Sequence, residues 1–343
     1  MREQNRKDEV MLGRRSLVTG GAGFIGSHLA ERLLKEDCKV TVLDNFSNGK
    51  IENIQRMLHK PSLVLAEEDL KRSRRLRQIV RSCDTIFHLA ANPEVRVGVT
   101  EPKVLFEENI LATFNLLEAV RKAGTPKTIV FTSTSTVYGE AEEIPTPENY
   151  APLLPISTYG ASKLACEALI TSYAYTFNHR ALILRLANIV GSRSNHGVIV
   201  DFIKKVRANY KKLEILGDGT QEKSYMHVAD CIQAMVHLTK TFLKGKRKVD
   251  VFNVGSNDKI TVESIAKIVT EEMGASCIEY QFTGGVDGGR GWKGDVKTMQ
   301  LSINKLLQTA WKPRYTSKQA VRLAARALIQ QQPDTANHTL MPI

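Results

Sequence analysis

The chain lacks the long apolar segments that a membrane protein or a secreted precursor needs. Its 343 residues contain no apolar run of about 18 residues, the length that indicates a membrane-spanning helix. The first residues are charged and carry no apolar signal-peptide core, so we expect residues 1–14 to form a frayed N-terminal extension. We therefore expect no association with membranes.

Cysteine is scarce, and the few cysteines are dispersed. No two of the five stand in C-x-x-C spacing, which argues against a zinc site and for free thiols. Free, scattered thiols are typical of a reducing compartment, so we expect a cytoplasmic protein without a metal site. The cysteines are Cys38, Cys83, Cys166, Cys231 and Cys277.

Positive charge is in excess, with a formal net charge of +12. Two basic runs contribute, at residues 71–77 and 244–248. Neither run is interleaved with aromatic residues, as a nucleic-acid surface often is, so we interpret both as solvated surface. We expect no nucleic-acid partner.

A glycine-rich turn follows the first predicted strand, residues 16–19. Glycines at positions 20, 23 and 26 permit a tight turn, close approach of the backbone to a pyrophosphate, and close helix-strand packing. A predicted helix opens at Phe24 and Ile25, and its N-terminal N–H groups favour an anion. The pattern predicts a dinucleotide site formed by Gly20, Gly23 and Gly26 with Phe24 and Ile25.

An acidic residue, Asp44, ends the second predicted strand, 39–43, and lies 18 residues after Gly26. A carboxylate there accepts the adenosine ribose hydroxyls and repels a 2′-phosphate, so we expect NAD rather than NADP. The alternative is that Lys50 counters the acid and admits NADP. The polar turn that follows contributes the candidate residues Asn45, Ser47, Asn48 and Gly49.

Further strands are predicted at residues 63–66, 85–89, 128–131 and 181–186. They are too apolar to be half exposed, which indicates a parallel, doubly wound Rossmann-type α/β sheet. Asp69 follows the third strand and could meet the adenine amino group. His88 is interpreted as a packing residue.

The pattern changes after about residue 190, where segments become shorter and richer in glycine and lysine. We therefore predict an NAD-binding domain at 15–190 and a smaller substrate-binding lobe at 191–330. Strands from the C-terminal half could return to the sheet. Residues 331–343 are expected to form a tail.

A tyrosine and a lysine, Tyr159 and Lys163, stand at i and i+4 and therefore share one helix face. An ammonium beside a phenol favours the phenolate, so we expect a lowered pKa for Tyr159, which suits a general base. A hydroxyl from Thr134, after the strand at 128–131, could converge on the same space. The predicted catalytic residues are thus Thr134, Tyr159 and Lys163.

In this order, the motifs resemble the extended short-chain dehydrogenase/reductase family, in its NAD-dependent epimerase/dehydratase branch that acts on nucleotide sugars. The resemblance covers about residues 14 to 325. The closest similarity is to UDP-glucose 4-epimerases. It implies 4-epimerisation of a UDP-hexose through a transient 4-keto sugar, with Tyr159 as base and tightly bound NAD. It also implies a homodimer built through a four-helix bundle, with helices near 106–121 and 158–177.

The residues at positions 135 and 136 help to choose the reaction. Related 4,6-dehydratases carry an Asp-Glu pair there and related decarboxylases keep the Glu, whereas this chain has Ser135 and Thr136. Epimerisation needs neither acid. The alternatives are a UDP-N-acetylhexosamine 4-epimerase, a 4,6-dehydratase, a decarboxylase, a 4-ketoreductase, or a non-catalytic NAD-binding regulatory protein.

The resemblance also implies a set of binding residues. Those for the cofactor are the glycine-turn and Asp44 residues named above, together with Asp69, Leu70, Leu89, Ala90, Ala91, Asn109, Thr132, Ser133, Tyr159 and Lys163. Those for the substrate are Thr134, Tyr159, Asn188, Val198, Leu216, Lys223, Arg290 and Met299. Three positions depart from the family pattern. Lys223 stands where an arginine is usual, and Ser224 replaces the aspartate that usually follows it. Trp292 replaces a phosphate-binding arginine, a task that we assign to Arg290.

Overall fold

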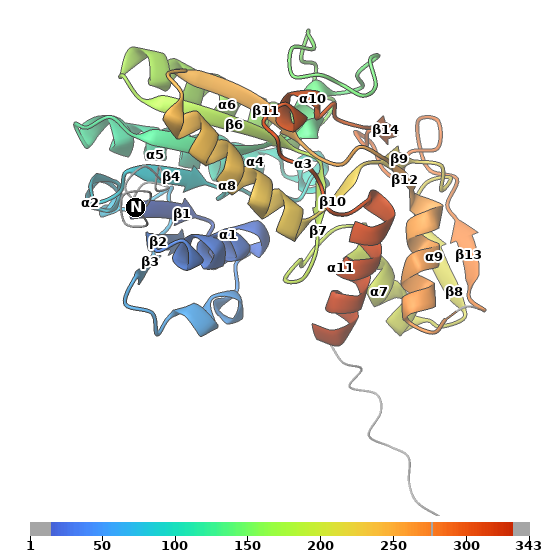
Figure 1. Ribbon diagram of the computed structural model, residues 1–343. Coiled ribbons are helices and arrows are strands. Elements are labelled where there is room, and N and C mark those ends of the chain that lie inside the picture. Colours follow the sequence, from blue (N-terminus) through green and yellow to red (C-terminus); the bar gives the residue numbers. More distant parts are fainter. Residues whose placement is uncertain (1–14, 276, 332–343) are drawn as a thin grey trace, which may run out of the picture.

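The computed structural model describes residues 15–275 and 277–331 (Figure 1). The predicted extension at 1–14 and the predicted tail beyond Gln331 lie outside the described residues. Within the described ranges, no helix is long and apolar enough to cross a membrane.

A seven-stranded sheet forms the larger part of the molecule, and every neighbouring pair of its strands is parallel. The strand order is β11-β6-β5-β4-β1-β2-β3. This confirms the predicted Rossmann-type α/β fold. The strands are β1 Arg15–Thr19, β2 Lys39–Asp44, β3 Leu63–Glu67, β4 Thr85–His88, β5 Thr128–Thr134, β6 Arg180–Leu186 and β11 Val249–Val254.

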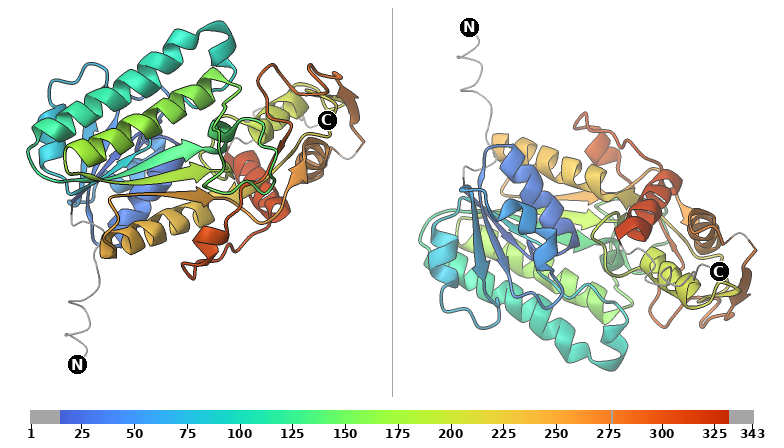
Figure 2. Two further views of the ribbon diagram at one scale, coloured as in Figure 1. Left: turned by 90° about the horizontal axis from the view of Figure 1, so that it is seen from above. Right: turned by 90° about the horizontal axis from the view of Figure 1, so that it is seen from below.

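Helices cover both faces of this sheet (Figure 2). One face carries α1 Phe24–Lys35 and α8 Val228–Lys244, and the other carries α2 Leu76–Arg81, α5 Ala112–Lys122 and α6 Thr158–Thr176. Successive residues of a strand point to opposite faces. Val18 of β1 accordingly packs in the cluster under α1, whereas Leu17 packs in the cluster under α5 and α6.

The helix predicted at 106–121 is interrupted near its start. After α3 Val97–Thr100, the chain forms α4 Pro102–Leu105, a π-helical segment Phe106–Leu111, and then α5. A π-helical segment shifts the side chains that follow it relative to a regular helix, and such segments occur often at functional sites.

Three helices of the C-terminal half form a third buried cluster: α7 Val198–Ala208, α9 Val262–Glu272 and α11 Ser317–Gln331. The Thr261 side chain caps α9 by accepting a hydrogen bond from Ser264 N. This cap gives a partner to one of the N–H groups that the first turn of a helix leaves without one. Short segments complete this part: β7 Asn188–Val190, β8 Lys212–Ile215, β9 Glu222–Lys223, β10 Tyr225–His227, β12 Ile260–Thr261, β13 Glu279–Phe282, β14 Thr298–Met299 and α10 Asn304–Leu307.

Two elements from the C-terminal half, one strand and one helix, pack with the large sheet and its covering helices. Strand β11 pairs with β6 at its edge, and α8 packs beside α1. The domain limits at 190 and 330 stay predictions, but the chain clearly crosses back to the sheet between about residues 228 and 254.

Candidate active site

A cleft of about 660 Å³ runs along the carboxyl ends of the central strands and is also lined by residues of the C-terminal half. Ligands of open parallel sheets bind at this edge, where the loops of several strands converge. All predicted site residues line the cleft except Asn109 and Arg290. Residues from motifs that are far apart in the sequence therefore line one cleft.

The glycine turn between β1 and α1 leaves no room for side chains. Gly20 has a φ of 67°, and a Cβ there would lie 2.8 Å from Ala90 N. A Cβ on Gly26 would lie 2.1 Å from Gly20 O. Gly23 is the N-cap residue of α1 and supplies no capping side chain, so the helix N-terminus is left for a ligand. This geometry suits a pyrophosphate.

Asp44 is held rigidly at the end of β2. Its carboxylate accepts hydrogen bonds from Ala22 N and Phe46 N, each 2.9 Å, and the residue is 6% exposed. A Cβ on Gly49 would lie 2.7 Å from Asp44 Oδ1, so the turn packs directly against the acid. Each carboxylate oxygen keeps a further lone pair that can accept a ribose hydroxyl.

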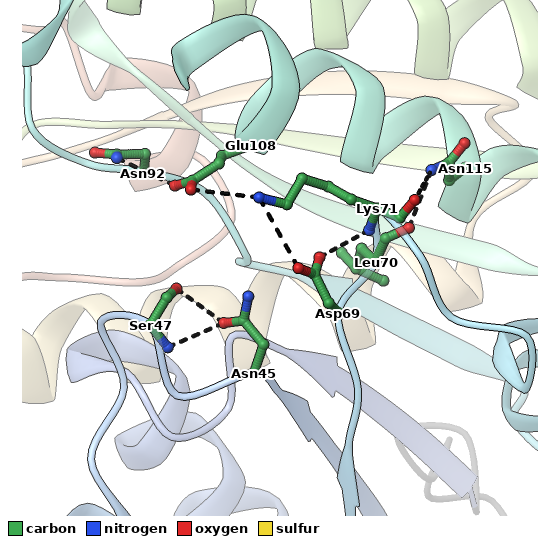
Figure 3. A network of polar contacts seen from close by, with 8 residues as sticks. All are labelled: Asn45, Ser47, Asp69, Leu70, Lys71, Asn92, Glu108 and Asn115. Carbon is green, nitrogen blue, oxygen red and sulfur yellow. Dashed lines mark hydrogen bonds and ion pairs between the residues drawn. The ribbon is translucent and has the colours of Figure 1, made fainter. Parts of the chain in front are cut away.

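The adenosine end of the predicted NAD site also contains Asn45, Ser47 and Asp69 (Figure 3). Asn45 Oδ1 accepts hydrogen bonds from Ser47 N at 3.1 Å and from Ser47 Oγ at 2.8 Å, which stabilise the turn after β2. Asp69 Oδ1 accepts a hydrogen bond from Lys71 N at 2.9 Å. These contacts hold polar groups at the cleft wall.

The predicted catalytic residues come from two adjacent elements. Thr134 ends β5, and α6 begins at Thr158, capped by Ser157 Oγ, which accepts a hydrogen bond from Gly160 N at 3.1 Å. Tyr159 and Lys163 therefore project from the first turns of α6 into the cleft. The Thr134 hydroxyl lies near enough to the phenol of Tyr159 to act on its pKa.

The expectation of a lowered pKa for Tyr159 is wrong for this structure. Burial raises the pKa of Tyr159 to about 12, and the hydrogen bond from Thr134 offsets only part of this effect. Burial also lowers the pKa of Lys163 to about 8, and its ammonium lies 4.2 Å from the centre of the Phe131 ring. Desolvation outweighs the attraction that the i, i+4 spacing suggested.

Asn109 and Arg290 do not line the cleft, and their predicted contacts with ligands stay predictions. Asn109 is buried behind the wall, where it accepts a hydrogen bond from Asn92 N at 2.7 Å and donates one to Ser162 Oγ at 2.9 Å. The Arg290 guanidinium instead pairs with Glu140. Arg290 also donates a hydrogen bond to Asp287 O within its own loop, and Trp292 lines the cleft.

Several polar residues of the cleft wall were missed by sequence reasoning. Lys71 belongs to the run that we interpreted as solvated surface, yet it lines the cleft together with Glu108. Arg96 was also missed; its guanidinium lies 5.9 Å from the centre of the Trp292 ring, and the predicted Lys223 lies 5.6 Å from it. The position of Lys71 two residues after Asp69 was the available signal.

His88 lies fully buried behind the cofactor side of the cleft. Its Nδ1 is 2.8 Å from Thr19 Oγ1 and its Nε2 is 2.9 Å from Thr113 Oγ1. Burial lowers the pKa of His88 to about 3, so the ring is neutral at physiological pH. The interpretation of His88 as a packing residue is confirmed.

The residues of the cleft fit a dinucleotide. The glycine cradle would be filled by any Cβ, and the fixed carboxylate of Asp44 can accept ribose hydroxyls. Ser133 Oγ, also in the cleft wall, is buried without a hydrogen-bond partner among the described residues. The roles of the individual residues stay predictions.

Proteins of known sequence and structure share this chain's pattern. A UDP-glucose 4-epimerase of Corynebacterium glutamicum is 29% identical and covers 89% of this chain and 92% of its own length. A UDP-glucuronic acid decarboxylase of Arabidopsis thaliana is 28% identical over 93% of this chain and 69% of its own. The chain is thus similar to enzymes of two reaction types.

Two solved structures illustrate the likeness in fold. A UDP-galactose 4-epimerase is 42% identical, with a TM-score of 0.79, and covers 92% of this chain and 99% of its own. A UDP-glucuronic acid 4-epimerase from Bacillus cereus, in complex with UDP-glucuronic acid and NAD, is 28% identical, with a TM-score of 0.82 and coverage of 93% and 100%. These 4-epimerases are isomerases.

The family match covers most of the cofactor-binding part of the chain. It spans residues 16–255, which include the glycine turn, Asp44, Tyr159 and Lys163. NAD is the cofactor of this family, as predicted. With 240 of 343 residues matched, the chain belongs to the NAD dependent epimerase/dehydratase family.

Proposed function

We propose that this protein interconverts UDP-glucose and UDP-galactose by NAD-dependent 4-epimerisation. The observation that carries the proposal is the chemistry beside Tyr159. Thr134 Oγ1 lies 3.2 Å from Thr136 Oγ1 in the cleft, so hydroxyl groups stand where elimination or decarboxylation would need a carboxylate. The similarity to 4-epimerases supports the same reaction.

The catalytic residues divide the work as follows. The Tyr159 oxygen takes the proton of the sugar 4-hydroxyl and later returns it, while the Thr134 hydroxyl keeps the phenol oriented. Bound NAD supplies a reversible hydride acceptor for the sugar C4. Lys163, which follows Tyr159 by one turn of α6, is the proposed source of the positive charge that would stabilise the phenolate.

The electrostatics of the substrate end favour a neutral sugar over a uronic acid. The Lys223 ammonium is 2.5 Å from Asp295 Oδ1, and Arg96 Nε is 3.0 Å from Glu94 Oε1. Each of these two cations is therefore already paired with a carboxylate of the protein. The negative charge of a uronate would find no unpaired partner in Lys223 or in Arg96. This supports a hexose, whereas the Bacillus cereus neighbour binds UDP-glucuronic acid.

N-acetylhexosamines are the second candidate substrates. Met299, in β14, lines the cleft and is the residue that we expect near C2 of the sugar. Methionine is flexible and fills irregular space, so it excludes a bulky C2 substituent less strictly than an aromatic residue would. We therefore keep the hexose as the proposed substrate and test the N-acetyl forms beside it.

A product assay tests the proposal. Purified protein, without added cofactor, is incubated separately with UDP-glucose, UDP-galactose, their N-acetyl forms and UDP-glucuronic acid, and the products are separated by anion exchange. Formation of the 4-epimer from the two hexoses is expected. No 4-epimer from any substrate would refute the proposal. In a separate incubation to which NADPH is added, its net consumption would indicate a 4-ketoreductase.

We further propose a homodimer that forms through α5 and α6. The outer side of this helix pair carries exposed aromatic residues, with Phe114 41% and Tyr175 64% exposed, and the pair would complete a four-helix bundle. Light scattering with size-exclusion chromatography is expected to give twice the chain mass, and Phe114→Glu is expected to shift it to the monomer. The cytoplasmic location stays a prediction, which cell fractionation tests.

A further inference from the structure

Lys71 reaches from one wall of the cofactor cleft to the other. Its Nζ lies 3.9 Å from Asp69 Oδ2, on the segment after β3, and 3.5 Å from Glu108 Oε1, in the π-helical segment before α5. All three residues line the cleft. Figure 3 shows the Lys71 ammonium between the two carboxylates, with Asn45 and Ser47 of the predicted ribose site below.

The Lys71 end of this bridge is firmly anchored. Asn115 Nδ2, from α5, donates hydrogen bonds to Leu70 O at 3.1 Å and to Lys71 O at 3.2 Å. Lys71 N donates in turn to the Asp69 carboxylate. The backbone from which the lysine side chain extends is therefore fixed to the helix on the opposite wall.

The Glu108 end is anchored as well. Glu108 Oε2 accepts a hydrogen bond from Asn92 Nδ2 at 3.1 Å, and Asn92 N donates to the buried Asn109 side chain. The two oxygens of Glu108 thus serve different partners, one the lysine and one the loop after β4. The carboxylate stays at the cleft edge because both oxygens are engaged.

A neighbouring ion pair shows that this one is shielded from water. Lys103 and Glu107 also approach to 3.5 Å, but their side chains are 85% and 41% exposed. The Lys71 and Glu108 side chains are only 21% and 25% exposed. Water and salt screen a partly buried pair less than an exposed pair, so the same distance corresponds to a stronger attraction.

We propose that the Lys71–Glu108 pair is a strap across the adenosine end of the cleft that slows the release of NAD. The cofactor cannot leave past this end until the ion pair opens. The inference rests on the proposed function for its purpose, because an epimerase regenerates its NAD in every turnover and gains from keeping it. Lys71 and Glu108 act here as positioning residues and touch no reacting atom.

NAD release from the loaded protein tests the strap. The protein is saturated with radiolabelled NAD, chased with excess unlabelled NAD, and sampled through a desalting column at intervals. Lys71→Met and Glu108→Gln are each expected to release NAD about fivefold to tenfold faster, as loss of a partly buried pair would cause. The double variant is expected to be no faster than either single variant, and Lys71→Arg is expected to keep the slow rate.

Controls separate the strap from a general loss of structure. Lys103→Met removes the exposed pair at the same distance and is expected to leave NAD release unchanged. Melting of the NAD-free variants is expected to match that of the unaltered protein, whereas raised salt is expected to speed NAD release only where the pair is intact. Unchanged release in Lys71→Met, or independent effects that multiply in the double variant, would overturn the proposal.

The readout is independent of which sugar is converted. Slow release that depends on Lys71, in a protein that epimerises no UDP-sugar, would support the strap and refute the proposed function. Normal epimerisation, with a rate of NAD release that does not change in Lys71→Met, would support the proposed function and refute the strap.

Discussion

The side-chain oxygens of Thr134 and Thr136 lie 3.2 Å apart in the cleft, and the Thr134 hydroxyl lowers the pKa of Tyr159, which burial raises. Thr134 Oγ1 also accepts a hydrogen bond from Thr136 N at 3.2 Å, so the short turn after β5 holds both hydroxyls together. Thr136, with Ser135 before it, is a neutral residue at a position where the related dehydratases and decarboxylases are expected to have an acid. The absence of an acid at this position favours the proposed epimerisation, in which hydride leaves and returns at the same carbon.

A carboxylate introduced at position 136 is expected to impair epimerisation. Thr136→Glu would compete for the Thr134 hydroxyl and place a charge beside the buried phenol, which disfavours the phenolate. Turnover of UDP-galactose is expected to fall at least about tenfold, the result of a rise of about one unit in the pKa of the base. Thr136→Ser is the control and is expected to retain most activity; equal activity of the glutamate variant would contradict the account.

Loss of the Tyr159 hydroxyl is expected to remove the base without emptying the cofactor site. Tyr159→Phe keeps the ring and its packing, so turnover should fall by about 10²- to 10⁴-fold, the usual contribution of a general base. NAD extracted from the variant by heat is expected to equal that from the unaltered protein. Retained turnover would show that another group takes the proton.

The lowered pKa of Lys163 predicts a pH dependence of stability in the NAD-free protein. Between about pH 8 and its ordinary value of 10.5, the unfolded chain binds the proton that the folded chain has lost, so the contribution of Lys163 to stability rises with pH. The rise is on the order of 3 kcal/mol over the whole interval, and about half of it falls between pH 8 and pH 9.5. Urea unfolding at pH 8 and at pH 9.5, compared with Lys163→Met, measures it; the variant is expected to show a smaller rise, and an identical pH dependence in both proteins would contradict the assignment.

Asp44 is expected to select NAD over NADP. Asp44→Ala removes the acceptor for the ribose hydroxyls and the charge that repels a 2′-phosphate, so NAD affinity should fall about tenfold or more. NADP affinity is expected to rise relative to NAD. Titration calorimetry on the NAD-free protein with both cofactors measures the ratio of NAD affinity to NADP affinity. Lys50→Ala is the control for the alternative that Lys50 counters the acid and admits NADP. An unchanged ratio in Asp44→Ala would assign the selectivity elsewhere.

Much of the cofactor site was predictable because its signals are local. Gly20, Gly26 and Asp44 lie at the ends of consecutive elements, and a parallel sheet brings those ends to one edge. The turn chemistry and the strand pattern thus determine where these residues lie. The same reasoning placed Tyr159 and Lys163 in the cleft.

The features of the site that the sequence did not predict depend on packing between residues that are distant in the chain. The direction of the Tyr159 pKa shift follows from burial by residues distant in sequence, and the pairing of Lys71 with Glu108 joins positions 37 residues apart. Arg290 lies in a loop whose glycines allow many conformations, so sequence spacing could not predict which way its side chain would turn. The place of β11 at the sheet edge likewise follows from its pairing with β6.

Isotope tracing at the sugar C4 shows whether hydride leaves this carbon and returns to it. UDP-galactose that carries deuterium at C4 is incubated with the protein in ordinary water, without added cofactor, and the UDP-glucose formed is examined by mass spectrometry and NMR. We expect the product to keep the deuterium at C4, because in the proposed 4-epimerisation the hydride returns to the carbon that released it. Product that has exchanged its label with water, or no UDP-glucose at all, would contradict the account.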